Sequence, residues 1–574
     1  MSSDVQLPVA AEATTTEPTA GRTTRSYNAA VANETLEDYS LRYAPRSFRR
    51  WSEFTVANTA IGGIAYLADF AIGASIALTH GAMNAIAAVL VAAVVIFLTG
   101  IPIAYYSAKY SIDMDLLTRA AGFGYLGSTI TSIVYASFTF IFFALEGSIM
   151  AQAFLVGFGL PLAAGYVLAS LIIIPLVVFG MTLLSKLQVW TQPIWLALMF
   201  APFVYVAFAD PGKYAAFTHW GPQGGSGASF NWLGFGLGMG VALSLIAQIG
   251  EQVDYLRFMP IKTAANAKRW WVSVILAGPG WVILGAGKQL GGAFLAFLVA
   301  GTVGLTRAGE PIEEYIGGFA TFLSAGVLGL AVFFVVLSQI KINVVNAYSG
   351  SLSWSNFFSR LLHYHPGRIV WIFFNVGIAL TLMELGVFGF LNAVLGFYSN
   401  VAIAWMGALV ADLVVNKPLG LSPPMVEFKR AHLFNFNPVG FGSMVLASIV
   451  SILAFFNVFG AYAQAFSPFL ALSIAFVLAP VIAAATRGRY YIAREDTLAE
   501  PLVVDGQLST VLLECSVCAT GFERPDMAHC PFHSGPICSL CCSLDKSCHD
   551  MCKTTARGGN GTRKADLEIT PKPA

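Results

Sequence analysis

Long apolar runs constrain the fold of this sequence more than any other feature. A helix that crosses the hydrocarbon core of a bilayer needs about 20 apolar residues, and it satisfies its own backbone hydrogen bonds there. Apolar residues make up 56% of the chain and charged residues only 11%, which no ordinary soluble domain would show. The sequence therefore predicts an all-α polytopic membrane protein with about 12 transmembrane helices. The runs begin near Thr55, Asn84, Tyr125, Ala163, Val189, Asn231, Trp271, Phe319, Ile369, Gly386, Pro438 and Ser467.

Basic residues in the connections predict the orientation, because Lys and Arg collect on the cytoplasmic side of inner and plasma membranes. One set of alternate connections holds only Lys213 and Arg307. Basic residues before the first span and after the last fall in the other, richer set, so both termini are predicted to be cytoplasmic. That set contains Lys109, Arg119, Lys186, Arg257, Lys262, Lys268, Arg269, Arg360, Arg368, Lys417, Lys429 and Arg430.

Composition also divides the chain into segments. Residues 1–50 are polar and lack the apolar core of a signal peptide, so they are predicted to be a disordered cytoplasmic leader. Residues 51–487 hold the spans. A linker is expected over 488–510, a Cys/His-rich module over 511–555, and a disordered tail over 556–574.

Five ionisable residues fall inside the predicted spans, where charge is costly and usually faces a cavity or a partner. They are Asp69, Glu146, Lys288, Lys341 and Glu384. A purely structural interpretation stays open for each, as an interhelical pair or as a residue close to the membrane interface.

Two glycine-rich spans stand in corresponding halves of the chain. The first contains Gly62 and Gly63 and the sixth contains four glycines ahead of Ser244, Gln248 and Gln252, with Glu251 beside them. Corresponding Gly-interrupted spans indicate broken helices at a transporter binding site. The alternative is that small residues only let the helices pack closely.

Polar and aromatic side chains share helix faces in two further spans. Phe142 and Glu146 are four residues apart in the third span, so together they could stack against and hydrogen-bond a flat heterocycle. Gln339, Asn343 and Asn346 follow helical spacing in the eighth span, and Asn amides both donate and accept.

At these residues the chain resembles the nucleobase cation symporter family, which includes purine and cytosine permeases and hydantoin transporters. The resemblance covers about residues 51–487. The most specific motif is Asp254-Tyr-Leu-Arg257-Phe258, similar to the Asp-aromatic-x-Arg-aromatic signature of that family. Further support comes from Asn346-Ala-Tyr-Ser-Gly-Ser-Leu, from Leu391-Asn-Ala-Val-Leu-Gly and from Ala411-Asp412.

The resemblance implies a leucine-transporter-type five-plus-five inverted repeat with two extra helices, working by alternating access. It places a heterocycle among Phe142, Glu146, Leu245 and Asn346. Three of these positions depart from the family pattern, with Phe for Trp, Glu for Gln and Leu for Trp. The predicted substrate site is completed by the residues of the two Gly-rich spans, namely Gly62, Gly63, Asp69 and Gln248.

The resemblance also bears on ion coupling. Sodium-coupled members place hydroxyl ligands in the eighth span where this chain has Ile340 and Lys341. A fixed ammonium would repel sodium, so transport is predicted to be sodium-independent or proton-coupled, with Lys341 or Glu146 as the proton carrier. In the alternative interpretation, Lys341 extends to the membrane boundary or forms a structural pair.

The C-terminal module has a separate chemistry, because it contains all eight cysteines of the chain. Cys-x2-Cys pairs with intervening histidines match tetrahedral zinc ligation, and a reducing compartment disfavours disulfides. An iron-sulfur cluster or a metal-free thiol-rich tail remain alternatives. The predicted ligands, enough for two sites, are Cys515, Cys518, Cys530, His533, Cys538, Cys541, Cys542, Cys548, His549 and Cys552.

The predicted function is secondary transport of a small nitrogenous heterocycle such as a purine or pyrimidine. No phosphate-binding loop suggests a pump, no catalytic constellation suggests an enzyme, and the near-zero net charge of +1 argues against nucleic-acid binding. The alternative is a transporter-fold receptor that signals to a cytoplasmic protein through the metal-binding tail.

Overall fold

The computed structural model describes residues 40–178, 180–224, 229–504 and 506–554, and most of them are helical. Within these residues nine spans are long and apolar enough to cross a membrane, and two shorter helices bent by 47° make a tenth. The shorter helices α7 (Leu162–Val178) and α16 (Arg368–Glu384) lie among them. The arrangement agrees with the twelve spans predicted from sequence, and the chain is a multi-pass membrane protein.

The first and sixth spans are both interrupted. The first consists of α2 (Glu53–Gly63) and α3 (Ala68–His80), separated by residues 64–67. The sixth consists of α10 (Trp232–Ala242), a 3-10 turn η4 (Leu243–Ala247) and α11 (Gln248–Leu256). Side chains start both spans: Ser52 Oγ accepts from Thr55 N at 3.2 Å, and Asn231 Oδ1 accepts from Gly234 N at 2.6 Å. Such N-caps satisfy amide groups that have no partner in the first helical turn.

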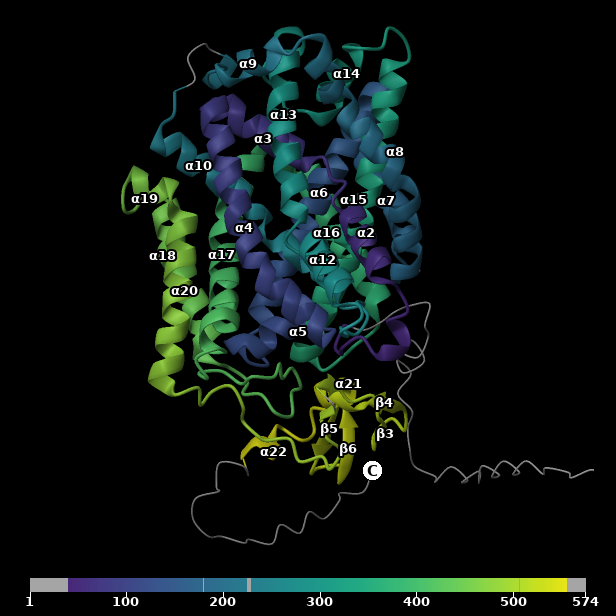
Figure 1. Cartoon of the computed structure of the whole chain (residues 1–574), viewed down its shortest axis with the longest axis vertical. Coiled ribbons are helices and arrows are strands. Elements are labelled where there is room, and N and C mark those ends of the chain that lie inside the picture. Colours follow the sequence, from purple (N-terminus) through teal and green to yellow (C-terminus); the bar gives the residue numbers. More distant parts are fainter. Residues whose placement is uncertain (1–39, 179, 225–228, 505, 555–574) are drawn as a thin grey trace, which may run out of the picture.

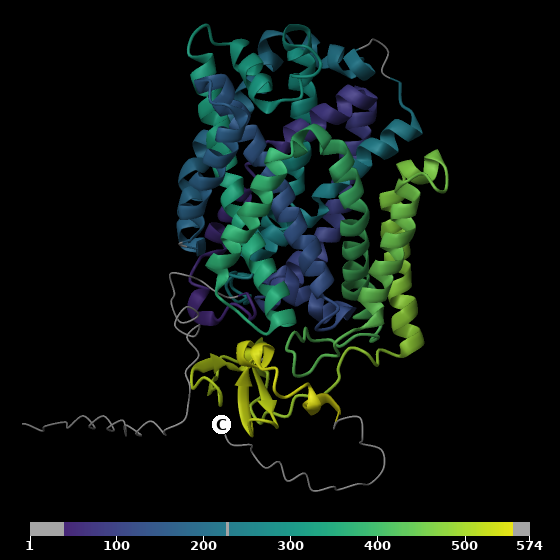
Figure 2. The same ribbon diagram turned by 180° about the vertical axis from the view of Figure 1, so that it is seen from behind.

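Most of the longer helices run along the long axis of the molecule (Figures 1 and 2). The eighth span, α15, begins at Val327 and not near Phe319, because Phe319 belongs to the separate short helix α14. The longer helices are α4 (Ala82–Tyr110), α6 (Thr129–Phe158), α8 (Gly180–Ala209), α12 (Ala267–Ala277), α13 (Trp281–Val303), α15 (Val327–Leu362), α17 (Leu391–Ala411), α18 (Ser443–Phe455) and α20 (Ser467–Thr486). Short helices are α5 (Met114–Thr118), α9 (Gly212–Thr218), α14 (Pro311–Ala320) and α19 (Ala461–Ala465).

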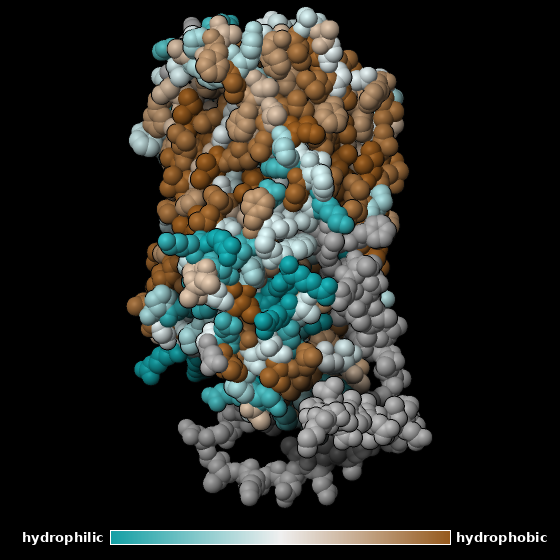
Figure 3. Space-filling view, turned by 45° about the vertical axis from the view of Figure 1, so that its right-hand side comes forward, coloured by the Kyte–Doolittle hydropathy of each residue, from teal (hydrophilic) through white to brown (hydrophobic). Residues whose placement is uncertain are grey.

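The outer surface of the helices is apolar. Large side chains such as Leu98, Phe208 and Phe390 are more than half exposed. In the space-filling view apolar residues cover most of the upper part, and hydrophilic residues gather toward the end that carries the C-terminal segment (Figure 3). This distribution suits a belt of lipid around the helices and water at that end.

The cysteine-rich segment forms a small module beyond that end, below α5 in Figure 1. Its elements after the short hairpin β1 (Val503–Val504) and β2 (Gln507–Leu508) are β3 (Leu512–Glu514), β4 (Gly521–Glu523), β5 (Met527–Cys530), β6 (Gly535–Cys538), α21 (Ser539–Leu544) and α22 (Met551–Thr554). All three strand pairs are antiparallel hairpins. We call residues 511–554 the tail module.

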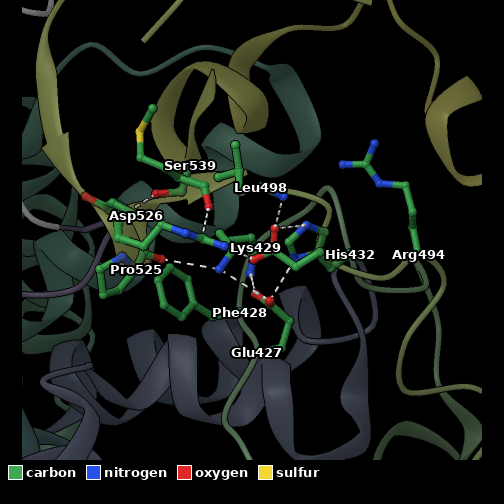
Figure 4. A network of polar contacts seen from close by, with 12 residues as sticks. Glu427, Phe428, Lys429, His432, Arg494, Leu498, Pro525, Asp526 and Ser539 are labelled. Carbon is green, nitrogen blue, oxygen red and sulfur yellow. Dashed lines mark hydrogen bonds and ion pairs between the residues drawn. The ribbon is translucent and has the colours of Figure 1, made fainter. Parts of the chain in front are cut away.

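The tail module packs on two segments of the membrane domain. Residues 40–46, which the sequence analysis places in the leader, are largely buried. There Arg42 Nε lies 2.6 Å from Asp526 Oδ2, and Tyr43 OH donates to Glu523. The second segment is the connection 417–437, where Lys429 Nζ donates to Pro525 O at 3.3 Å and is paired with Glu427 (Figure 4).

Candidate functional site

The break in the first span is held by Glu146 of α6. Its carboxylate accepts from Leu67 N at 3.2 Å and from Ala68 N at 3.1 Å. These amides belong to the start of α3, where helix amides lack partners and the helix dipole favours negative charge. Glu146 is fully buried. It therefore meets the first span directly, and it does so as a cap on the backbone.

Lys288 of α13 occupies the other side of the same break. Its Nζ donates to Ile64 O at 2.6 Å and to Tyr66 O at 2.9 Å, and it lies 3.0 Å from Asp69 Oδ2. The remaining Asp69 oxygen accepts from Gln289 Nε2 at 2.9 Å. A fixed ammonium thus binds the carbonyl oxygens that the break exposes. In the sequence Lys288 stands out only as a buried charge, because its contact with the break depends on how α13 packs against α3.

The break in the sixth span contributes a second buried acid. Leu245 lies in the 3-10 turn, and Gln248 begins α11 and donates to Glu251 Oε2 at 2.7 Å. Glu251 Oε1 is buried and has no hydrogen-bond partner within the residues that the structure describes. Glu251 and Glu146 are close enough to interact electrostatically. The sequence analysis mentions Glu251 but does not include it in the predicted site.

The long helix α15 supplies amides next to α6. Asn343 Nδ2 donates to Phe143 O at 3.3 Å, and Asn346 Nδ2 donates to Asn343 Oδ1 at 3.1 Å. The side-chain oxygen of Asn346, Oδ1, is buried, and no described residue donates to it. On α6, the ring of Phe142 packs on Phe138 with centroids 4.5 Å apart. Buried polar atoms without partners are uncommon and often mark a place where a ligand or water binds.

Lys341 lies on a different face of α15. Its Nζ donates to Thr191 Oγ1 at 2.8 Å and to Gln188 O at 3.2 Å, and Gln188 Nε2 donates back to Lys341 O at 2.7 Å. The side chain is buried between α15 and α8. The buried carboxylates of Asp69 and Glu146 instead interact with Lys288 and with the backbone of the break.

The glycines of the first span lie at tight helix contacts. A Cβ added to Gly62 would lie 2.7 Å from Gln188 Cβ, and one added to Gly63 would lie 3.2 Å from Val345 Cγ2. The packing explanation therefore accounts for both residues. The unwound segment begins directly after them, at residue 64.

The Asp-aromatic-x-Arg motif ties three helices together. Tyr135 OH donates to Asp254 Oδ2 at 2.9 Å. Arg257 NH2 donates to Tyr348 OH at 2.9 Å, and its NH1 lies 3.5 Å from Asp113 Oδ2. All five side chains are buried. These contacts join α11 to α6, to α15 and to Asp113 at the start of α5.

Four cysteines of the tail module form a compact thiol cluster. Cys515, Cys518, Cys538 and Cys541 are buried, and their sulfur atoms all lie within 4.8 Å of one another. Four thiols gathered in this way suit a tetrahedral metal ion such as zinc. None of the eight cysteines, all within the described residues, is in a disulfide bond.

The arrangement of the helices resembles solved transporters. A closed form of Mhp1, a nucleobase-cation-symport-1 family transporter with bromovinylhydantoin bound, superposes with a TM-score of 0.56 at 16% identity, over 80% of this chain and 100% of that one. The chain has a transporter fold. The inward-facing conformation of Mhp1 has a TM-score of 0.56 at 15% identity, over 81% of this chain and 95% of that chain.

A third solved structure, the substrate-bound outward-open state of a sodium-coupled sialic acid symporter, has a TM-score of 0.51 at 14% identity, over 79% of this chain and 93% of that one. No sequence-family profile and no curated protein matches the chain. The likeness confirms the predicted fold.

Proposed function

We propose that the chain is a secondary transporter for a small nitrogenous heterocycle, with the solute bound between the two interrupted spans. The observation that carries the proposal is the pair of buried oxygens, Asn346 Oδ1 and Glu251 Oε1, that have no partner among the described residues. Both are acceptors, so they favour a ligand with ring or exocyclic N–H groups. Nucleobases and hydantoins offer such groups on a flat ring, which Phe142 could cover.

The test is uptake of labelled heterocycles by purified protein in proteoliposomes. We expect Asn346→Ala and Glu251→Gln each to lower uptake at least about tenfold. That factor corresponds to the free energy of about one hydrogen bond to a charged or buried group. Asn84→Ala is the matched control, because both groups of the buried Asn84 amide bond the protein: Nδ2 donates to His80 O at 2.8 Å, and Oδ1 accepts from Asn231 N at 2.9 Å. Uptake that survives both site variants would refute the site. Glu146→Ala should also abolish binding, because the first span would lose the cap that shapes its break.

We further propose that the carrier needs no sodium, with Lys288 as the resident cation. Its ammonium lies among carbonyl and carboxylate oxygens, which are the ligands that a hard cation would use. Lys341 carries a second fixed charge near α8. The proposal thus keeps sodium independence from the sequence analysis and adds Lys288 to Lys341 and Glu146 as the groups to test for proton coupling.

Flux in sodium and in choline buffer tests the coupling proposal. Wild-type flux should be the same in both, whereas Lys288→Met or Lys341→Thr should change the ion requirement if that lysine replaces a metal. A steep sodium requirement in the wild type would show that both assignments are wrong. Response of wild-type flux to a pH gradient separates proton coupling from uniport.

A receptor is the second candidate, favoured by the close packing of the tail module on residues 40–46 and 417–437. It would bind the heterocycle with the same affinity as a carrier but show no flux in proteoliposomes.

We place the tail module in the cytoplasm, because the basic connections lie at its end of the molecule, and we propose that Cys515, Cys518, Cys538 and Cys541 bind zinc. A module in reach of cytoplasmic proteins suits either candidate.

A further inference from the structure

The four cysteines outside the compact cluster line a second small cavity. Cys530, Cys542, Cys548 and Cys552 surround a space of about 20 Å³. That volume admits a single water-sized or ion-sized particle. All four residues come from the tail module: Cys530 ends β5, Cys542 lies in α21, Cys548 precedes α22 and Cys552 lies in α22.

Helix α21 explains why neighbouring cysteines separate into two groups. Consecutive residues of a helix point about 100° apart. Cys541 therefore turns toward the compact cluster, while Cys542 turns toward the second cavity. The two groups also interleave along the chain, because Cys530 of the second group falls between Cys518 and Cys538 of the first.

Among the histidines of the module, His529 lines the cavity beside the four thiols, and the two histidines predicted as ligands do not. His533 Nε2 lies 2.6 Å from Asp545 Oδ2, and neither His533 nor His549 lines the cavity. The four thiols are enough for a tetrahedral ion without His529. The sequence spacing could not decide this, because both histidines have metal-ligand spacing from a cysteine.

The second cavity lies where the tail module meets the membrane domain. Ala431 and Arg494, which belong to the membrane domain and to the segment that follows it, line the cavity together with the cysteines. Arg430 NH1 donates to Cys542 O at 2.7 Å, and Arg430 Nε lies 2.9 Å from Asp550 Oδ1. Asn435 Nδ2 donates to Asp550 Oδ2 at 3.1 Å.

Positive charge lies near three of the four thiols. Arg430 interacts electrostatically with Cys542 and Cys548, and Arg494 and Lys553 do so with Cys552. A zinc ion with four thiolates carries two net negative charges, which these cations would offset. A purely apolar thiol cluster would not need them.

We propose that Cys530, Cys542, Cys548 and Cys552 bind a second zinc ion, and that this ion fastens the tail module to the 417–437 connection. The proposal does not depend on which solute is transported. Among the described residues only the compact cluster has its sulfur atoms within 4.8 Å of one another. The sulfur atoms of Cys530, Cys542, Cys548 and Cys552 must therefore move together to bind an ion. We expect this second site to bind zinc more weakly than the compact cluster and to lose its zinc to a chelator first.

Elemental analysis of the purified full-length protein tests the site. We expect two zinc ions per chain in the wild type and in His533→Ala/His549→Ala, and one in Cys548→Ser/Cys552→Ser. One ion in the wild type, two in the cysteine variant, or one in the histidine variant would each overturn the proposal. If the cysteine variant loses both ions, X-ray absorption at the zinc edge of the wild type decides, since only sulfur ligands are expected and a nitrogen ligand would refute the assignment.

Hydrogen exchange tests the fastening role. In Cys548→Ser/Cys552→Ser, the amides of residues 417–437 should exchange at least about tenfold faster than in the wild type, while those of α6 should not change. Unchanged exchange in the connection, with one zinc ion lost, would show that the ion does not fasten the module.

Discussion

At the scale of single residues, the pair formed by Lys288 and Asp69 decides how the first span is interrupted. Both side chains are fully buried, and their charges are 3.0 Å apart. Removing one partner of a buried pair leaves an uncompensated charge, whereas removing both often costs little.

We therefore expect Lys288→Met to lower the stability of the purified protein by about 3–5 kcal/mol. The double variant Lys288→Met/Asp69→Asn should recover most of that loss, because the Asn amide needs no counter-charge. The midpoint of thermal unfolding in detergent measures both. Equal midpoints for the single and the double variant would show that the charge pair is not the source of the loss.

At the scale of elements, α3 and α13 approach closely through glycines. A Cβ added to Gly292 would lie 2.1 Å from Phe70 O, and one added to Gly73 would lie 1.7 Å from Gln289 O. Helices in lipid gain contact area by such close approach. The same contact brings Lys288 to the break, so the packing of two helices positions the charge.

Gly292→Ala should separate α3 from α13 and destabilise the protein by about 1–3 kcal/mol or more. Gly287→Ala is the matched control on the same helix, because nothing lies within 4 Å of an added Cβ there. It should be neutral or stabilising by up to about 1 kcal/mol, since Ala favours the helix. Thermal unfolding compares them, and equal losses would contradict the packing argument.

At the scale of the whole molecule, the tail module and the membrane domain form one unit through charged contacts. Burial alone would raise the pKa of Glu427, but Lys429 and His432 hold it below its usual value. Figure 4 shows this cluster beside Pro525 and Asp526 of the module. The contact therefore stabilises the folded state only while Glu427 is ionised.

A depressed folded-state pKa means that this stabilisation is complete above the ordinary Glu pKa of about 4.3 and is lost as the pH falls below it. We expect the difference in hydrogen exchange of residues 417–437 between wild type and Glu427→Gln to be large at neutral pH and to vanish in acid. Comparing the two proteins at each pH cancels any loss of metal. A difference that persists in acid would show that the charge of Glu427 is not responsible.

Composition and spacing along the chain are enough to predict the membrane class, most of the spans, the two glycine-rich interruptions and the separate thiol chemistry of the tail. Each of these follows from local composition and spacing, which lipid and metal chemistry restrict strongly. The contacts of the buried charges are seen only in the folded molecule. Glu146 caps α3, Lys288 donates to the carbonyl oxygens of the break, and Lys341 donates to Gln188 and Thr191 of α8. Each contact joins residues that are far apart in the sequence, so local spacing could not predict it. The division of the cysteines between two groups likewise depends on the direction in which α21 turns adjacent side chains.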